Sequence, residues 1–596
     1  MSVYEEFHYK EKTPEETLEK LQFILKDCGI DVEEAWPLTS SIGTFSLRVS
    51  IKGTNIGTNG KGVSKDYARA SAYAEFFERF QNNILGHTIP NPKLPYIIAT
   101  DEKFLSAQEL LFEPNAYTDF YFIERKMEDA SLVERIKRYE DVNRFDKEVS
   151  GKGYYLSLPF YSVRDKKVVY LPYSSYSAMY GSNGMCAGNS PEEALVQGLS
   201  EIVERIVQRK AILEKTSFPD IPIDYIKKYS YIYEMYEKAC KNTKYKILLK
   251  DCSFGGKYPV VALCIIEKNT GRYGIKFGCH PNIGIAMERT FTEVTQGIDI
   301  FEYSQKRSWF DFSNSGVDNS DNISNSYKIG LSQYPYQFFS EKSDYVFTET
   351  KNVSNCNNIE ILKNWIHDFL PEYDILIRDV SFTGFPSYQI IIPGLSEMQS
   401  LSDYDIRTRN TRSYVAYLLT HPEEITIQNV TYIIGILKIY SNSVFENSLS
   451  TYFPPDYIMN LPFDSIGSDI YLLSMCYIIK GDYQEALNYL KILQKRAKYG
   501  DDRQLIEEIN CIYHYISGMH IINNHKEVIE YLKIFFSDDL CILIDKIFKE
   551  PEKVIVNQYK NAIKGKNEEY EHFRELIALK YSNIVINQKN NEKIFY

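Results

Sequence analysis

The sequence lacks several patterns that would assign it quickly to a class of protein. In its 596 residues, no apolar run approaches the roughly 18 residues that a membrane-spanning helix needs. Its ten cysteines form no CxxC pair and no zinc-like spacing, which favours reduced thiols in a cytosol over a disulfide framework. The N-terminus is polar and acidic, unlike a secretory signal. These absences predict a cytoplasmic protein without a membrane segment.

The sequence also lacks an excess of positive charge. Asp and Glu number 80 against 68 Lys and Arg, which gives a formal net charge of -12. A general nucleic-acid binder needs a basic face to offset phosphates, so direct binding to nucleic acid is not expected. The common nucleotide loops are missing too: no GxxxxGK precedes a Ser or Thr, and no GxGxxG opens a helix after a strand. Any nucleotide site must therefore use other residues.

The length and composition predict a folded protein of two to four domains, with 44% hydrophobic and 25% charged residues. Apolar residues alternate in some segments and follow helical spacing in others, without a regular βαβ order, so we predict an α+β fold. Strands are expected at 45–51, 153–163, 167–174, 258–266 and 387–393. Helices are expected at 13–28, 64–83, 190–211 and 284–300, with a turn at 59–62 and a loop at 313–326.

Strand signals fade after about residue 400, and helical patterns take over. Residues 469–493 have small or aromatic side chains at positions typical of a tetratricopeptide unit, with Gly481 in the turn, and 510–533 is a weaker copy. A plain helical bundle explains the same pattern, and both interpretations stay open. We predict an α+β domain over 1–400 and an all-α, TPR-like domain over 401–596.

Two segments share an unusual pattern. "NGKGVSKDYARASAYAEFFER" (59–79) and "NGMCAGNSPEEALVQGLSEIVER" (183–205) both open with Asn-Gly and end with Glu-x-x-Glu-Arg. One such ending is usually an exposed ion pair on a helix, but two matching copies favour a shared site. Helical spacing places acidic and polar side chains on one face of each segment. These side chains are Ser71, Glu75 and Glu78 in the first segment, and Ser190, Glu193, Gln197, Glu201 and Glu204 in the second.

The chemistry of these faces indicates a metal and a phosphate. Carboxylates that face one another while partly buried repel unless a cation lies between them, and Glu, Gln and Ser oxygens suit Mg²⁺. Arg79 and Arg205, which end the two motifs, can each hold phosphate oxygens by two hydrogen bonds. A third segment, 285–297, adds Arg289 and Glu293 on one helical face. The alternative is that the glutamates only pair with basic residues inside a core.

Taken together, the three segments resemble the signature motifs of the YcaO family. SxxxExxER (71–79), SxxExxxQxxxExxER (190–205) and RxxxE (289–293) follow the order of that family's three signatures. "TNGKG", "SNGMCAGN" and "GCHPNIGIAMERT" beside them also look like that family. The resemblance is strong over roughly residues 1–400 and is greatest for stand-alone members with a helical C-terminal region. It implies a fold that binds ATP and Mg²⁺ between glutamate-bearing helices, without a Walker loop.

The resemblance also implies a role for individual residues. Contacts to Mg²⁺ are expected from Thr17, Glu75, Glu78, Asn189, Glu193 and Glu204. Contacts to the nucleotide are expected from Lys10, Ser71, Arg79, Cys186, Gln197, Glu201, Arg205, Arg289 and Glu293. Within these sets, the expected catalytic residues are Glu75, Glu201 and Arg205.

YcaO proteins use ATP to phosphorylate the oxygen of a backbone amide, so that phosphate rather than water is lost afterwards. Attack by a Cys, Ser or Thr side chain then gives an azoline, and attack by sulfide gives a thioamide. Azoline-forming members have a proline-rich tail, whereas this chain ends "NNEKIFY". No fused leader-peptide-binding domain is apparent in the sequence either. The resemblance therefore favours another product here.

Stand-alone members are associated with methylthiolation of a ribosomal protein, beside a radical methylthiotransferase. The CxxxCxxC motif of the radical enzyme is missing here, so this chain is not that enzyme. We expect activation of an amide in a peptide or protein, with a ribosomal protein as a candidate substrate. The alternative is a nucleotide-binding accessory protein that docks the methylthiotransferase and turns over little. A homodimer is expected in both cases.

Overall fold

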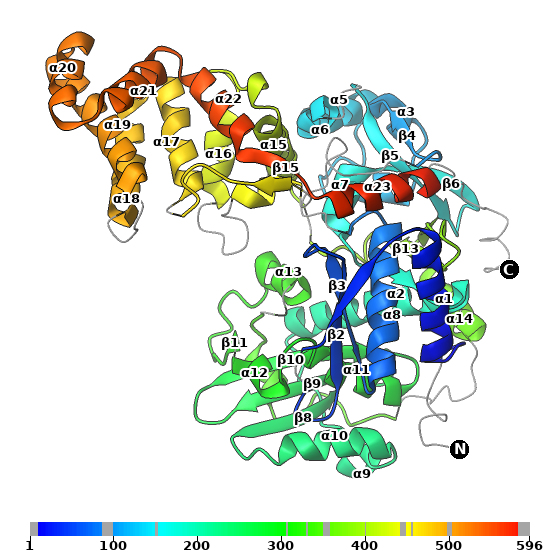
Figure 1. Cartoon of the computed structure of the whole chain (residues 1–596). Helices are drawn as coiled ribbons and strands as arrows, with labels where there is room; N and C mark the ends of the chain where they lie inside the picture. Colours follow the sequence, from blue (N-terminus) through cyan, green and yellow to red (C-terminus); the bar gives the residue numbers. More distant parts are fainter. Residues whose placement is uncertain are drawn as a thin grey trace.

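The computed structural model of the chain describes residues 10–37, 39–85, 99–149, 153–305, 308–328, 330, 332–349, 358–399, 401–440, 449–454, 457–465, 467–497 and 503–581. The protein has the predicted α+β fold, with a mixed N-terminal part and a mostly helical C-terminal part (Figure 1). No helix in the described ranges is long and apolar enough to cross a membrane.

A small antiparallel sheet and two helices form the N-terminal layer. Its strands pair in the order β1 (Val32–Ala35), β2 (Phe45–Ile51) and β3 (Gly57–Gly62). The helices are α1 (Pro14–Asp27) and α2 (Lys65–Gln81). Both helices and strand β2 were predicted, and Thr13 caps α1 by accepting a hydrogen bond from the N–H of Glu16. Leu47 and Val49 of β2 are fully buried in the same core cluster as α1 and α2.

The predicted turn at residues 59–62 is wrong, because these residues belong to β3 and pair with β2. Their glycines allow close packing rather than a turn. A Cβ at Gly60 would lie 2.1 Å from the backbone nitrogen of Ala72 and 2.2 Å from the carbonyl oxygen of Ala68, both in α2. Glycine therefore lets β3 lie directly against the backbone of α2.

Two larger sheets build the rest of the N-terminal part. One is antiparallel in the order β11 (Ser308–Trp309), β10 (Arg272–Cys279), β9 (Val260–Glu267) and β8 (Tyr245–Asp251). The other has the order β4 (Lys103–Leu105), β5 (Tyr155–Ser162), β12 (Leu376–Asp379), β13 (Ser387–Ile391) and β7 (Met185–Ala187), with β6 (Lys167–Pro172) also paired to β5. β5, β6, β9 and β13 confirm the predicted strands.

The central helix of this part is α8 (Pro191–Leu213), which contacts β7 and β13 of one sheet and β10 of the other. Its apolar side, with Leu195, Leu199 and Ile202, is buried. Other helices of the N-terminal part are α3 (Ala107–Phe112), α4 (Ala116–Ile123), α5 (Leu132–Val142), α6 (Arg144–Val149), α7 (Tyr173–Tyr180), α9 (Ile223–Ile226), α10 (Ser230–Cys240) and α14 (Asn358–Phe369), with the 3₁₀ turn η1 (Tyr336–Phe339).

The helix predicted over 284–300 is in fact two helices. They are α11 (Ile283–Val294) and α12 (Ile300–Gln305). Gly297, which lies between them, has a φ of +78°, a left-handed conformation that ends a helix and favours glycine.

The Asn/Ser-rich segment 313–326 was predicted as a loop, but it contains α13 (Ser320–Lys328). Here polar side chains do the packing. Ile323 and Ser326 are buried, and the amide of Asn322 donates to the carbonyl oxygens of Val317 and Gln333. Composition alone therefore misled the prediction at this point.

The C-terminal part consists of consecutive helices around their own hydrophobic core. They are α15 (Asp403–Thr420), α16 (Val430–Tyr440), α17 (Ser468–Lys480), α18 (Tyr483–Ala497), α19 (Arg503–Ile522), α20 (His525–Phe535), α21 (Asp538–Lys549) and α22 (Pro551–Ala562), with the 3₁₀ turns η2 (Pro422–Glu424) and η3 (Leu449–Tyr452). The last helix, α23 (Glu568–Tyr581), packs in a different core. Gly481 ends α17 with a φ of +78°, as the predicted helix–turn–helix requires. A TPR-like repeat stays a prediction.

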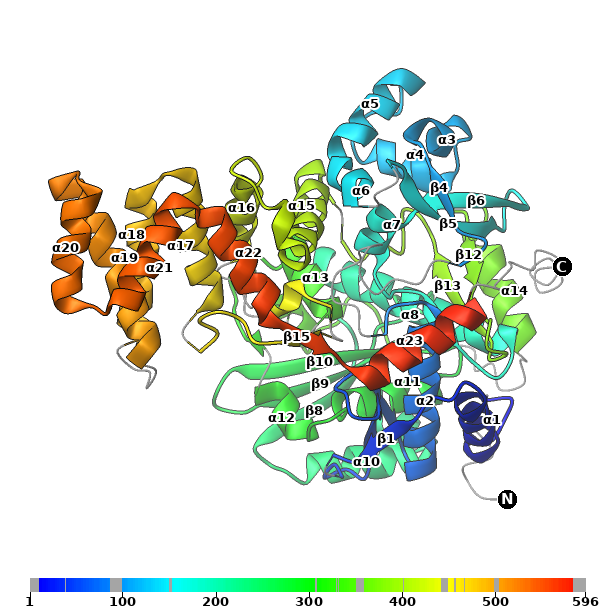
Figure 2. The same ribbon diagram turned by 45° about the horizontal axis from the view of Figure 1, so that its top comes forward.

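Two features of the C-terminal part were not predicted. Strands β14 (Tyr457–Met459) and β15 (Ile563–Lys566) pair as a short antiparallel ribbon. After β15 the chain leaves the other C-terminal helices, and α23 lies across one end of α2 in both views (Figures 1 and 2). The buried side chains of α23 share a core cluster with those of α1 and α2.

Replacing Gly60 by alanine tests the close contact of β3 with α2. We expect Gly60→Ala to lower the free energy of unfolding by about 2–3 kcal/mol, because an overpacked backbone contact must be relieved. Chemical denaturation measures the change. Gly435→Ala is the matched control, since no atom lies within 4 Å of a Cβ added there in α16. That variant should be neutral or gain up to about 1 kcal/mol from helix propensity, and equal effects at both positions would contradict the packing.

Candidate functional site

Three helices of the N-terminal part carry the motif residues. α2 carries Ser71, Glu75, Glu78 and Arg79; α8 carries Glu193, Gln197, Glu201, Glu204 and Arg205; and α11 carries Arg289 and Glu293. Their charges interact between helices. The negative charges of Glu201 and Glu293 both raise the pKa of Glu75, after the larger effect of its burial. The structure therefore brings the three motifs to one place.

Each arginine of the two ExxER motifs pairs with its own glutamates. Arg79 lies 3.6 Å from Glu75 Oε1 and 3.4 Å from Glu78 Oε1, and Arg205 lies 2.5 Å from Glu201 Oε1. The NH1 group of Arg205 is buried and has no hydrogen-bond partner among the described residues. A buried N–H without an acceptor is costly, and a phosphate oxygen would satisfy it.

Glu293 is held by two lysines, one on each carboxylate oxygen. Lys61 of β3 pairs with Oε1, and Lys276 of β10 lies 3.5 Å from Oε2. Burial would raise the pKa of Glu293, but the two ammonium groups outweigh it and hold the pKa at about 2. Motif reasoning missed Lys276, because a single lysine in a strand gives no signal until the strand is placed beside α11.

Burial without enough positive charge has the opposite effect on three other glutamates. It raises the pKa of Glu78 to about 8 and that of Glu204 to about 7, and neighbouring carboxylates add to both shifts. The pKa of Glu75 is raised for the same reasons. These side chains therefore lie where a cation would stabilise their ionised form, which fits a site for Mg²⁺.

The N-terminal segment meets the beginning of α8 in a second group. Glu193 accepts a hydrogen bond of 2.8 Å from the N–H of Glu11 and lies 3.3 Å from Lys10 Nζ. Asn189 donates to Glu193 at 3.2 Å and accepts from the Thr17 hydroxyl at 3.0 Å. Burial opposes ionisation of Glu193, but Lys10 and these donors outweigh it, so its pKa is lowered. The four residues predicted in these two segments, Lys10, Thr17, Asn189 and Glu193, therefore lie together.

Arg289 links α11 to α8. Its NH1 donates to the Cys279 carbonyl oxygen at 2.6 Å, and its NH2 donates to the side-chain oxygen of Gln197. Ser71 lies half-buried on α2, in the same motif as Glu75. The thiol of Cys186 differs from the rest: it is fully buried and donates to the Tyr388 carbonyl oxygen, so the structure places this side chain in the core.

These side chains do not form a closed metal cage by themselves. Within the part of the chain that the structure describes, no group of three His, Cys, Asp or Glu side chains is arranged to hold a metal ion. The carboxylates are instead held by arginine and lysine. The donor set fits Mg²⁺ bound together with a phosphate, since protein carboxylates then supply only some of the ligands. The assignment of individual residues to the metal stays a prediction.

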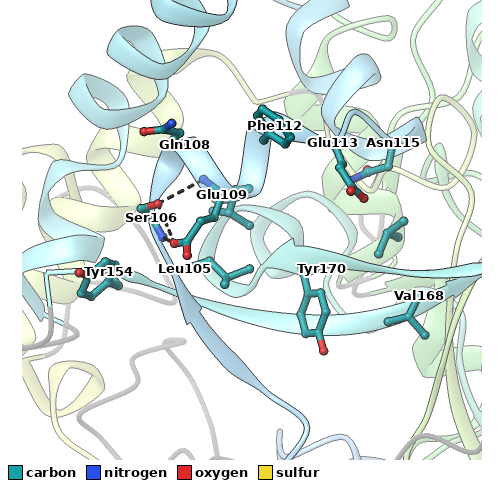
Figure 3. A pocket seen from close by; sticks show the side chains of 12 residues that line it. Leu105, Ser106, Gln108, Glu109, Phe112, Glu113, Asn115, Tyr154, Val168 and Tyr170 are labelled. Atoms are coloured by element: carbon teal, nitrogen blue, oxygen red, sulfur yellow. Dashed lines mark hydrogen bonds between the residues drawn. The ribbon is translucent and has the colours of Figure 1, made fainter.

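A separate pocket lies between α3 and β6 (Figure 3). Its lining includes Leu105, Phe112 and Tyr170, and the hydrogen bonds drawn at its edge are those of the Ser106–Glu109 capping box of α3. None of its lining residues belongs to the three motifs. The glutamate site is therefore distinct from this pocket.

The fold and the site together define a class of protein. It is an α+β protein without a Walker loop, in which helices supply glutamates and arginines to one site. Residues 59–396 match the family described as YcaO cyclodehydratase, ATP- and Mg²⁺-binding. This chain belongs to the YcaO family, and ATP and Mg²⁺, the predicted cofactors, are those of the family.

Two relatives are similar over most of their length. The Escherichia coli (strain K12) protein named Ribosomal protein S12 methylthiotransferase accessory factor YcaO is 30% identical over 423 residues, which cover 68% of this chain and 69% of that protein. An uncharacterized protein of Haemophilus influenzae is 29% identical over 411 residues, 66% of each chain.

Solved structures share less with this chain. A heterocyclase in complex with substrate and cofactor is 17% identical with a TM-score of 0.42, over 65% of this chain and 53% of that one. YcaO from Methanopyrus kandleri, bound with AMPPCP and Mg²⁺, is 14% identical with a TM-score of 0.38, over 65% of this chain and 92% of that one.

The raised pKa of Glu78 predicts a stability change with pH. Its pKa of about 8 in the folded protein exceeds the ordinary value of 4.5, so ionisation costs stability progressively as the pH rises between these values. Glu78→Gln removes that cost. In the absence of metal and nucleotide, we expect the free energy of unfolding of this variant to rise relative to that of the wild type as the pH rises. The difference should reach roughly a few kcal/mol above pH 8.

Thermal unfolding between about pH 5 and 9 measures this difference. Glu214→Gln is the control, since this carboxylate lies at the end of α8 with 49% of its side chain exposed. Its stability relative to the wild type should show no such trend. A constant difference between Glu78→Gln and the wild type across this range would contradict the burial of an uncompensated charge.

Proposed function

We propose that this protein uses ATP and Mg²⁺ to activate a backbone amide of a peptide or protein. The observation that supports this most is the meeting of three motif helices around carboxylates and arginines, with a buried Arg205 N–H that has no acceptor in the described part of the chain. ATP would supply the phosphoryl group that turns the amide oxygen into a leaving group, with Mg²⁺ offsetting the charge of its phosphates. The residues of the chain would position and neutralise these groups.

Each part of the site has a task in this proposal. Glu75, Glu78 and Glu204 would hold Mg²⁺, whereas Glu193 with Asn189, about 16 Å from Glu204 along α8, would form a separate Mg²⁺ contact at the start of that helix. Arg205 would donate its unpaired N–H to a phosphate oxygen. The nucleotide side would be formed by Ser71, Arg79, Gln197, Glu201, Arg289 and Glu293, with Lys10 nearby.

The relative from Escherichia coli supports a second candidate, because its name describes an accessory factor of a methylthiotransferase. In this alternative the protein binds ATP, turns over little, and docks a methylthiotransferase through its helical part. A TPR-like domain beginning near residue 401, a homodimer and a cytoplasmic location belong to both candidates. If the protein activates amides, peptide assays should test for an azoline and for a thioamide as the product.

Replacing the expected catalytic carboxylates tests the first candidate. We expect Glu75→Gln and Glu201→Gln to lower ATP hydrolysis at least about 100-fold, because each removes a carboxylate that would hold Mg²⁺ or position the nucleotide. Release of ADP and AMP is measured with the full chain and candidate peptides, including those of small-subunit ribosomal proteins. Wild-type folding of each variant is checked by thermal unfolding.

Glu214→Gln, on the same helix as Glu201, should keep wild-type activity. Equal hydrolysis by the wild type and both site variants would show that the site assignment is wrong. Tight ATP binding without release of product from any peptide would instead favour the accessory function.

The raised pKa values also predict how Mg²⁺ binding depends on pH. A carboxylate must lose its proton to bind the ion, and Glu78 and Glu204 have pKa values of about 8 and about 7. In the presence of ATP, Mg²⁺ affinity should therefore rise between about pH 6 and 8 and level off above. Calorimetry in buffers of different ionisation enthalpy should detect protons released on binding at pH 7. No proton release at that pH would contradict the proposed ligand set.

A further inference from the structure

Helix α2 faces the proposed site on one side and the hydrophobic core on the other. One carries Glu75, Glu78 and Arg79 toward the site. The other carries Phe76, Phe77 and Phe80, which are all buried. Phe76 and Phe80 lie four residues apart, next in sequence to Glu75 and Arg79, so any rotation of α2 moves both sets together.

A helix from the far end of the sequence contacts the last turns of α2 on this side. The ring of Phe573 in α23 meets Phe76 edge-on, with centroids 6.5 Å apart, and Phe80 in the same way at 6.1 Å. Phe573 is itself 5% exposed. Edge-on aromatic pairs of this kind contribute about 0.5–1.5 kcal/mol beyond their buried area, and their geometry is directional.

Contacts along α23 fix its position over the same layer. At its beginning, Asn567 donates to the Gly53 carbonyl oxygen at 3.2 Å, and the Tyr570 hydroxyl donates to the Leu85 carbonyl oxygen at 3.3 Å. Near its end, Lys580 lies 2.7 Å from Asp27 at the end of α1, and the ring of Tyr581 lies 4.6 Å from Phe382. α23 is therefore held at both ends, with Phe573 between them.

We propose that Phe573 is a positioning residue for the ATP and Mg²⁺ site. Its ring fixes the rotation and depth of α2, and through them the placement of Glu75, Glu78 and Arg79 on the other side of that helix. The inference rests on the proposed function for its ligand, but the contact between α23 and α2 is independent of it. The proposed positioning residue lies near the other end of the sequence from these glutamates.

Phe573→Ala in the full chain tests the proposal. We expect the dissociation constant for ATP with Mg²⁺ to rise about tenfold, because loss of the ring lets α2 shift behind its glutamates and arginine. Phe573→Leu keeps most of the volume and should recover most of that loss. Hydrolysis at saturating ATP should fall much less than the affinity, because the catalytic groups are still present. Calorimetry and steady-state kinetics measure the two effects.

Hydrogen exchange gives a readout that does not depend on ATP. Amides of residues 65–81 in α2 should lose protection in Phe573→Ala and keep it in Phe573→Leu. Leu579→Ala is the matched control, since Leu579 lies on the same helix and is 70% exposed. It should change neither protection nor affinity. If Phe573→Ala fails to fold, Phe573→Leu is tested instead. A smaller rise in the dissociation constant for ATP with Mg²⁺ is then expected.

Two results would overturn the proposal. Folded Phe573→Ala with wild-type affinity for ATP would mean that α23 stabilises the chain without positioning the site, and the proposed function would stand. A wild type that binds no ATP with Mg²⁺ would overturn the proposed function, and with it the role of Phe573 there. Loss of α2 protection in that second case would still establish the contact.

Discussion

The structure depends on one electrostatic constraint: glutamates on separate helices must be kept close together and partly out of water. Such an arrangement is unfavourable by itself, since burial penalises each carboxylate and its neighbours repel it. Two features of the chain offset the cost. Arginine or lysine lies against most of these carboxylates, and an extensive apolar core holds the helices from behind. The rise of the Glu78 pKa to about 8 shows that the compensation is incomplete without a ligand.

Close backbone packing makes this arrangement possible. β3 approaches α2 through Gly60, and α8 approaches β7 through Gly198, where a Cβ would lie 2.9 Å from the sulfur of Cys186. Larger residues at either glycine would push a glutamate-bearing helix away from its sheet. The same contact explains why the Cys186 thiol lies in the core although its motif lies beside the site.

The sequence was informative wherever function depends on local spacing. Intervals of three and four residues placed Glu75 with Glu78, and Glu201 with Glu204, on single helical faces, and the structure has those helices. It was less informative where partners come from distant segments. Lys276 lies in a strand whose alternation says nothing of α11, and Phe573 is an ordinary core residue of an amphipathic helix. The error at 59–62 has the same origin, since glycine in a turn and glycine under a helix look alike in sequence.

The pairing of arginines with glutamates also gives the site a means of changing partners. Arg79 pairs with Glu75 and Glu78, and Arg205 pairs with Glu201. On the proposed function, a divalent cation beside these carboxylates would replace the arginines as their source of positive charge. Each guanidinium would then be free to donate to phosphate oxygens a short distance away, and its helix would not need to move. On this proposal the same residues would stabilise the carboxylates and bind the nucleotide, which would require α2 and α8 to be rigid and gives the aromatic packing behind α2 a role.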